Sequence, residues 1–352
     1  MTISPQPSPT PTAPVMGRLV QVAERRGLSG LAGALVALSD FVANDLVGVE
    51  RQLSSTPTRG ELVGSAAQHL LDLKGKRIRP LCVALAARAG KGFDERGVKL
   101  AAAVELVHSA TLLHDDVVDH GDERRGRPTA RVLFGNAASV FAGDWLLIRA
   151  LRLVRETGLD DLTGRLLDII EVMIEAESVQ LERRGVLQAD RDAYFHIIEG
   201  KTASLFRWAM EAGGRAGGLE WQDCRAMAQY GNELGMAFQI VDDALDLSGS
   251  TGKSMYTDIK EGKLTYPLLV ALEQRPEMRQ DLEAVLENQG AIDGRVEARI
   301  RRQLEETRAV DRSLELAQEH ATRARNHIAR LPDSQAKEGL ELVAEVAVRR
   351  PS

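Results

Sequence analysis

The chain has 352 residues, of which 44% are hydrophobic and 27% are charged, and its formal net charge at pH 7 is -6. A chain of this length buries enough apolar surface to fold without disulfides, and its acidic total argues against a general nucleic-acid binder. Its two cysteines have no partner at ligand spacing, which argues against a zinc site. No charge-free apolar run approaches the roughly 18 to 20 residues of a membrane span, and no signal-peptide pattern is present, so we expect a soluble, cytoplasmic protein.

Residues 1–15 are rich in proline, serine and threonine, which predicts a flexible tail. After it, apolar residues recur at helical spacing, as at Leu31, Leu35 and Leu38, whereas strand-like alternation is scarce. Glycine clusters separate the periodic segments, and no internal repeat or linker is evident. We therefore predict an all-α fold with one large domain over residues 16–352.

The first basic segment is LKGKRIRP, and its cationic side chains are Lys74, Lys76, Arg77 and Arg79. We expect Gly75 to loosen the backbone there and Pro80 to open the next helix. Lysine supplies point charges and arginine a planar donor fork, the usual combination for binding phosphate oxygens. Taken alone, such a run is also typical of a solvated helix entrance.

The first acidic segment lies in LVHSATLLHDDVVDHGDERRG. His108, Asp115 and Asp119 fall on one stripe of a helix, with Asp116 beside it. The surrounding apolar residues imply burial, and buried carboxylates protonate unless cations compensate them. Oxygen ligands at this spacing suit Mg²⁺. The alternative is a helix end with solvated acids and the two following arginines as surface partners.

The second acidic segment, FQIVDDALDL, repeats this geometry more than 100 residues later. Gln239, Asp242 and Asp246 share one helix face, and Asp243 lies alongside. Two such stripes that face each other could hold metal ions over a common cavity and stabilise a diphosphate leaving group. The alternative is that the two stripes are exposed and unrelated.

Three more lysines stand beside glycines: Lys201 in IEGKTASLF, Lys253 in TGKS and Lys263 in EGKLTYP. A site that holds metal and diphosphate needs such cations to offset the phosphate charge.

Taken in order, the motifs KGKRIRP, ATLLHDDVVD, ERRGRPTA, FGNAASVFAGDWLL, IEGKTASLF, QIVDDALD and EGKLTYPLL resemble the trans-isoprenyl diphosphate synthases, the polyprenyl synthetase family. The similarity runs from about Leu71 to the C-terminus and is greatest to the long-chain, octaprenyl-type branch. It implies a single bundle of about a dozen helices around a deep central cavity, usually in a homodimer, with the two aspartate stripes opposite each other at its mouth.

The resemblance also implies roles for individual residues. Magnesium binding, to about three ions once substrate is bound, is assigned to the two stripes, and we include the aspartate beside the first: Asp115, Asp116, Asp119, Asp242 and Asp246. Contacts to the allylic diphosphate are assigned to Arg124, Lys201 and Lys253. Isopentenyl diphosphate is assigned to Lys76, Arg79, His108 and Arg125. Two polar residues border the developing carbocation: Thr202 and Gln239.

The implied activity is the condensation of an allylic prenyl diphosphate with isopentenyl diphosphate. Metals and cations stabilise the departing diphosphate, the allylic C–O bond breaks, and the double bond of isopentenyl diphosphate attacks the carbocation. A proton is then lost, and the released diphosphate is its implied acceptor, because no general base is evident. Water must be excluded from the cation.

Product length is expected to depend on what blocks the cavity beneath Asp115. Ala110 and Thr111 lie there and neither is bulky, which predicts an all-trans product of about thirty to fifty carbons. The helix that contains Phe141 and Trp145 is a candidate for a deeper floor. A shorter geranylgeranyl product is the alternative. A product this hydrophobic also suggests peripheral contact with a membrane.

The segment GKSMYTD departs from the family pattern, because Ser254 and Tyr256 stand where proline and glycine are usual. Tyrosine does not readily adopt a positive φ, so we expect loop closure, the contact of Lys253 and any role of Asp258 to be altered here.

Rival functions remain at this stage. A class I terpene cyclase has no second diphosphate to bind, against which the LKGKRIRP segment weighs. A His-Asp phosphohydrolase could use His114 and Asp115 but needs further histidines. A non-catalytic partner subunit is expected to have lost acidic residues, and here both stripes are intact.

Overall fold

The computed structural model describes residues 29–55, 60–73, 75–248 and 256–349. The predicted tail, Lys253 and Ser254 lie outside these ranges. In chain order the helices are α2 (Ser29–Ser54), α3 (Glu61–Asp72), α4 (Ile78–Arg88), α5 (Glu95–Val118), α6 (Ala130–Phe134), α7 (Asn136–Arg155), α8 (Asp160–Glu182), α9 (Arg191–Ile198), the π-helical turn η1 (Glu199–Ala203), α10 (Ser204–Ala216), α11 (Trp221–Ser248), α12 (Thr257–Lys260), α13 (Tyr266–Gln274), α14 (Met278–Glu287), α15 (Gly294–Glu306), α16 (Ala309–Ile328) and α17 (Gln335–Val348).

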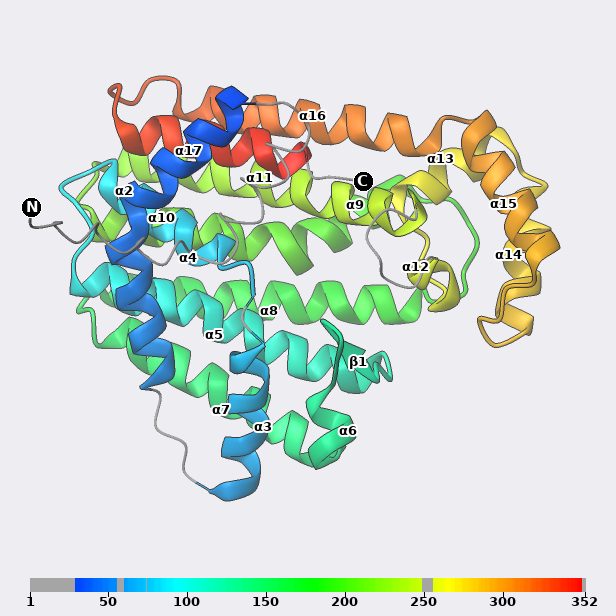
Figure 1. Cartoon of the computed structure of the whole chain (residues 1–352), viewed down its shortest axis with the longest axis horizontal. Coiled ribbons are helices and arrows are strands. Elements are labelled where there is room, and N and C mark those ends of the chain that lie inside the picture. The colour runs from blue at the N-terminus through cyan, green and yellow to red at the C-terminus, as the bar shows by residue number, and fades with distance from the viewer. Residues whose placement is uncertain (1–28, 56–59, 74, 249–255, 350–352) are drawn as a thin grey trace, which may run out of the picture.

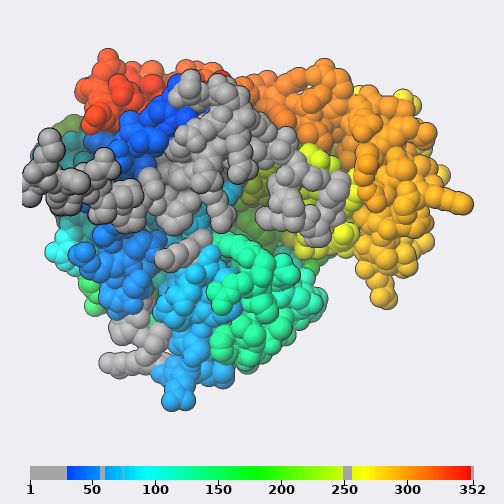
Figure 2. All heavy atoms as spheres, viewed as in Figure 1, coloured from blue at the N-terminus to red at the C-terminus, as the bar shows by residue number. Residues whose placement is uncertain are grey.

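The prediction of an all-α fold is confirmed (Figure 1). Helices α4, α5 and α10 are buried over most of their length, which is the pattern of helices enclosed by others. Helix α5 packs against α7, α4 and α2, while α11 packs between α10 and α16. Helices α14 and α15 lie together at one end of the molecule, where Figure 2 shows them as a lobe beside the bundle.

Two glycines set the close approach of α10 to α11. A Cβ at Gly231 would lie 2.4 Å from the carbonyl oxygen of Phe206, and one at Gly235 would lie 2.5 Å from the Cα of Ala203. A larger residue at either position would push the helices apart. Because Ala203 ends η1, this packing fixes the position of Lys201 and Thr202 relative to the second acidic stripe on α11.

The sheet found in the described residues is one short antiparallel hairpin, β1 (Glu123–Arg124) with β2 (Arg127–Pro128). Its turn residues, Arg125 and Gly126, have φ of 56° and 77°. A two-residue hairpin turn of type I′ requires a positive φ at both of its central residues, and its twist matches that of the two strands. The hairpin follows α5 and presents Arg124 and Arg125 beside the first acidic stripe.

Helix α2 is long and apolar enough, over Gly30–Ser54, to cross a membrane by length and composition, with a mean hydropathy of 1.5. It nevertheless packs against α4, α5 and α17, and its buried residues include Leu38, Val42 and Val49. Its Asp45 is buried and paired with Arg88. These contacts are those of a core helix.

Candidate active site

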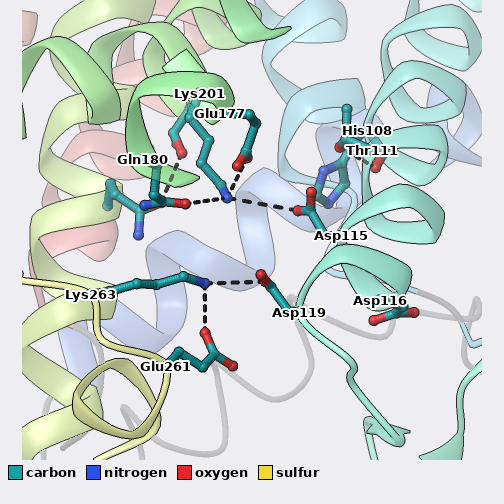
Figure 3. Close-up of polar contacts among 12 residues, drawn as sticks. His108, Thr111, Asp115, Asp116, Asp119, Glu177, Gln180, Lys201, Glu261 and Lys263 are labelled. Atoms are coloured by element: carbon teal, nitrogen blue, oxygen red, sulfur yellow. Dashed lines mark hydrogen bonds and ion pairs between the residues drawn. The ribbon is translucent and has the colours of Figure 1, made fainter. Parts of the chain in front are cut away.

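The first acidic stripe lies at the C-terminal end of α5, where two lysines from other elements meet it (Figure 3). The ammonium of Lys201 on η1 lies 3.9 Å from Asp115 Oδ2. It also pairs with Glu177 and donates to Gln180 Oε1 at 3.0 Å, both on α8. Lys201 therefore bridges α8 to the end of α5 and lies beside Asp115 of the first stripe.

Asp119 is held by two cations at once. Lys263 Nζ lies 3.1 Å from its Oδ2, and the guanidinium of Arg184 pairs with its Oδ1. Burial would raise the pKa of Asp119, but Lys263 and Arg184 outweigh it and hold that pKa below its usual value. Asp115 differs, because burial together with Glu177 and Asp119 raises its pKa to about 6 against the opposing charge of Lys201.

The aspartate next to each stripe has a structural partner. Asp116 is only 3% exposed and accepts two hydrogen bonds from Arg124, at 2.7 and 3.0 Å. In Figure 3 its carboxylate points away from Asp115 and Asp119. The assignment of Asp116 to the metal set, and of Arg124 to the allylic diphosphate, is therefore not supported by this arrangement. Adjacent helix residues diverge by about 100°, and Asp116 falls on the side of the hairpin.

Asp243 on α11 is likewise buried. Its two oxygens accept hydrogen bonds from the Tyr194 hydroxyl at 2.7 Å and from Gln239 Nε2 at 2.8 Å. Burial, opposed by these two bonds, raises the pKa of Asp243 to about 6. The Oε1 of the same Gln239 accepts from the Thr202 hydroxyl at 2.8 Å. Thr202 and Gln239, assigned together from the sequence, are thus directly bonded.

The π-helical turn η1 carries Lys201 and Thr202, and such turns are frequent at functional sites. It packs against α8, where a Cβ at Gly200 would lie 2.6 Å from the Cβ of Ala176. Lysine 201 can reach α8 and α5 because the backbone of η1 lies this close to α8.

The second stripe meets Lys263 through Asp258. Asp242 is exposed, and Asp246 Oδ2 accepts from the backbone amide of Asp258 at 3.0 Å. Burial, followed by the charges of Asp243 and Asp246, raises the pKa of Asp258 well above its usual value. Lys263 is close enough to Asp258 and Asp119 to interact with both. A chain of charges therefore joins the ends of the two acidic stripes.

A cavity of about 120 Å³ opens between these elements. Its lining includes polar side chains from η1, α11, α12 and the following loop: Lys201, Thr202, Gln239, Asp243, Asp258 and Lys263. The cavity therefore gathers Lys201 with the two residues predicted to border the carbocation, whereas the aspartates of the two stripes are not among its lining residues.

The residues predicted to bind isopentenyl diphosphate form a second cluster. Burial, followed by the charges of Arg79 and Arg125, lowers the pKa of His108 well below its usual value, so its imidazole is neutral at pH 7. Arg79 stacks over the Phe206 ring with its guanidinium carbon 4.4 Å from the centroid. Lys76 is exposed and stands three residues before Arg79 in the chain. His108 stands seven residues before Asp115 on α5, about 10 Å away along the helix axis.

The basic segment is anchored by a residue without an assigned role. Arg77 has a φ of 49° and donates to Glu50 at 2.6 Å and to Glu105 at 2.5 Å. Arg77 therefore fixes the backbone of the segment that carries Lys76 and Arg79. Gly75 also leaves space for Arg125, because a Cβ there would lie 3.0 Å from Arg125 Nη2.

Of the residues expected to limit product length, Thr111 lies one turn below Asp115, and its hydroxyl donates to the His108 carbonyl at 2.9 Å. Ala110 is buried in the core, and Trp145 packs partly buried against the same core. Phe141 on the same helix is 60% exposed, so within this chain it does not contribute to a cavity floor. The period of α7 turns Phe141 outward.

Tyr256 also differs from expectation. It adopts a left-handed conformation with φ of 63° in spite of its side chain, and it is 3% exposed. Such a conformation costs about 1 to 3 kcal/mol, an amount that burial of an aromatic ring can offset. Its amide donates to the carbonyl of Asp246 at 3.2 Å. The loop therefore returns directly to the second stripe.

The donor set fits a divalent metal that shares its coordination with a substrate. Within the described ranges no three His, Cys, Asp or Glu side chains are gathered so as to hold an ion by themselves. Asp243 and Asp258 line the cavity together with Lys201 and Lys263, and these two lysines also pair with Asp115 and Asp119 of the first stripe. Mg²⁺ is commonly held by one or two carboxylates together with phosphate oxygens.

Sequence patterns did not single out Glu177, Gln180, Arg184 or Tyr194 as site residues. The spacing of Glu177 and Gln180 places both on one face of α8, which was the available signal. Arg184 and Tyr194 lie after α8 in the chain, and only the fold brings Arg184 to Asp119 at the end of α5 and Tyr194 to Asp243 on α11.

Comparison with known proteins is consistent over most of the chain. The family model described as polyprenyl synthetase matches residues 60–302. Octaprenyl diphosphate synthase of Haemophilus influenzae is 39% identical over 296 residues, covering 82% of this chain and 88% of the relative. The Escherichia coli octaprenyl diphosphate synthase is 34% identical over 324 residues, covering 90% of this chain and 99% of the relative.

Solved structures agree with these relatives. A decaprenyl diphosphate synthase from Rhodobacter capsulatus has a TM-score of 0.83 at 34% identity, covering 89% of this chain and 98% of its own. A polyprenyl synthase from Caulobacter crescentus, complexed with calcium and isoprenyl diphosphate, has a TM-score of 0.83 at 34% identity, covering 98% and 100%.

Proposed function

Because the chain belongs to the polyprenyl synthetase family, we propose that it condenses an allylic prenyl diphosphate with isopentenyl diphosphate to an all-trans polyprenyl diphosphate of about thirty to fifty carbons. The observation that carries this is the pairing on α5 of two separate anion sites. Asp115 and Asp119 meet Lys201 and Lys263 at one end, and His108 stands among arginines two turns earlier.

The allylic diphosphate belongs at the aspartate end. Divalent metal bound there supplies charge that stabilises the leaving diphosphate. Mg²⁺ suits the carboxylates of Asp115, Asp119, Asp242 and Asp246, and we propose about three ions when substrate is bound. Lys201 and Lys263 already stand beside these acids and are preorganised for the charge that develops on the departing diphosphate.

Isopentenyl diphosphate belongs at the cluster of Arg79, His108 and Arg125. A neutral imidazole can donate one hydrogen bond to a phosphate oxygen, while the arginines offer paired donors. The stretch of α5 between the two anion sites sets the distance between the reacting carbons. A terpene cyclase has no use for this second site.

The direct test is incubation with farnesyl diphosphate, labelled isopentenyl diphosphate and Mg²⁺, followed by chain-length analysis of the dephosphorylated products. We expect labelled polyprenols of about thirty to fifty carbons. Asp119→Asn should abolish them in a folded protein, and Asp122→Asn, on the exposed loop after α5, is its control. Folded wild-type protein that makes only a volatile hydrocarbon, or no elongated product, would contradict the proposal.

We also propose a homodimer. Apolar side chains exposed on α7 and α8 recur at a spacing of seven residues, which places them on one face of each helix: Phe141, Ile148, Leu167, Ile174 and Leu181. Helices α7 and α8 contact each other, and we infer that their exposed apolar faces together receive a second copy of the chain. Ile174→Glu should yield a monomer in sedimentation experiments, whereas Leu62→Glu, equally exposed on α3, should not. A dimeric Ile174→Glu would contradict the assignment.

The hydrophobic product would bring this soluble dimer to the membrane surface.

A further inference from the structure

Arg184 reaches the acidic stripe from the loop that follows α8. Its Nη2 pairs with Asp119 Oδ1, and its Nη1 approaches the carbonyl of Val118 at 3.5 Å. Its Nε is buried and has no hydrogen-bond partner among the residues that the structure describes. A guanidinium with an unused donor therefore lies at the edge of the diphosphate site.

The position of Arg184 is fixed by its neighbour. The amide of Gly185 donates to the carbonyl of Gly262 at 2.9 Å, and a Cβ on Gly262 would lie 2.9 Å from that same nitrogen. The two glycines have φ of 74° and 71°. Gly185 follows Arg184 in the chain, and Gly262 precedes Lys263. The hydrogen bond between the two glycines therefore holds Arg184 and Lys263 near each other, and the two cations pair with different oxygens of Asp119.

The two cations are not equivalent. Lys263 has a second carboxylate partner, Glu261, at 2.6 Å, whereas the described residues give Arg184 no carboxylate besides Asp119. A divalent ion that binds Asp119 competes with the cations that already pair with its two oxygens. Arg184 is held by one carboxylate and Lys263 by two, and the planar fork of Arg184 matches phosphate oxygens that arrive with the metal.

We propose that Arg184 is a further residue of the allylic diphosphate site. In the empty enzyme it is the counter-ion of Asp119, and when metal takes that carboxylate the guanidinium turns to the diphosphate. The proposal rests on the proposed function for the identity of the ligand. It is tested with inorganic pyrophosphate and metal alone, so that its failure is distinct from a failure to elongate prenyl chains.

The first measurement is Mn²⁺ binding by electron paramagnetic resonance without any phosphate. Arg184→Gln should bind Mn²⁺ about three- to tenfold more tightly than wild type, because a competing cation has left Asp119. The second is calorimetric binding of pyrophosphate at saturating Mg²⁺, which should be about tenfold weaker. In steady-state assays the KM for the allylic substrate should rise while the KM for isopentenyl diphosphate stays within twofold.

Arg215→Gln is the matched control. It removes the same charge, but Arg215 pairs with Asp161 near the far end of α10. Both of its affinities should stay within twofold of wild type. Arg184→Lys keeps the charge without the fork, so it should retain the Mn²⁺ affinity of wild type and still lose pyrophosphate affinity. If Arg184→Gln does not fold, the pyrophosphate affinity of Arg184→Lys alone tests the proposal. A pyrophosphate affinity within twofold of wild type in every folded Arg184 variant overturns the proposal.

Discussion

The ammonium of Lys263 lies 3.1 Å from Asp119 Oδ2, although 144 residues separate the two in the chain. This contact closes the site between α5 and the loop before α13. It also removes one charge of each sign from water, because the Lys263 side chain is only 13% exposed and that of Asp119 only 19% exposed. A buried pair of this kind depends strongly on both members.

Lys263→Gln should therefore lower kcat with the allylic substrate by about a hundredfold to a thousandfold, the usual effect of removing one preorganised donor to a developing anion. Lys260→Gln on α12 is the control, because that lysine is exposed. Steady-state kinetics with both substrates measures the effect. A Lys263→Gln enzyme within fivefold of wild type would show that Lys263 serves stability alone.

How much of this site could be predicted depended on whether the information was local. The stripe of His108, Asp115 and Asp119 follows from helix periodicity, because α5 is unbroken from His108 to Asp115 and Asp119 is its C-cap residue. The partner of each carboxylate cannot be predicted from helix periodicity. Asp116 was grouped with the metal ligands because it adjoins Asp115, and only the fold of the hairpin shows that Arg124 occupies it.

Other features of the site depend on long-range contacts. The space that Gly75 must leave for Arg125 depends on a hairpin fifty residues later. Phe141 is apolar, and composition cannot distinguish the core of one chain from an apolar surface. The bundle itself was predictable, since a helical period that persists along the chain leaves few other folds.

Gly75→Ala should affect one substrate and spare the other. The added methyl would lie 3.0 Å from Arg125 Nη2 and 3.3 Å from Glu105 Oε1, so the guanidinium must move. We expect the KM for isopentenyl diphosphate to rise about three- to tenfold, with the KM for the allylic substrate unchanged, because small displacements of binding groups are costly. Gly164→Ala, which has open space around it on α8, should leave both unchanged. Equal changes in both KM values would instead indicate a general loss of structure.

Thr111→Phe should shorten the product. Thr111 is partly exposed one turn below Asp115, where a growing chain that starts at the aspartates must pass. A phenyl ring there should shift the main product toward about fifteen to twenty carbons, since it fills space needed by later isoprene units. Chain-length analysis of the alcohols measures the shift. Thr111→Val matches the native volume and should keep the wild-type length, and an unchanged distribution for Thr111→Phe would refute the assignment.

The two cysteines should be inert in the native protein. Burial raises the pKa of Cys82 to about 12 and that of Cys224 to about 11, so both remain protonated at pH 8. A thiol whose folded pKa is raised stabilises the fold fully below its ordinary pKa of about 9. That contribution is lost as the pH rises from there toward 12. A thiol-exchange reagent at pH 8 should titrate neither cysteine until denaturant is added, and rapid modification of either one would contradict their burial.

Tyr194→Phe and Tyr230→Phe separate positioning from stability. Each tyrosine is buried and donates one hydrogen bond, Tyr194 to Asp243 at 2.7 Å and Tyr230 to the carbonyl of Leu340 at 2.6 Å. Loss of either hydroxyl removes one buried hydrogen bond and should cost about 1 to 2 kcal/mol in the free energy of unfolding.

Only the first of these acceptors leads into the site, because Asp243 also orients Gln239, which in turn accepts from Thr202. Tyr194→Phe should therefore lower kcat about ten- to hundredfold, the effect usual for outer residues that orient a catalytic group. Tyr230→Phe should lose similar stability, measured by urea unfolding, and keep its kcat. Equal kcat values in two equally destabilised variants would mean that the bond to Asp243 holds α9 to α11 without directing the polar groups that border the carbocation.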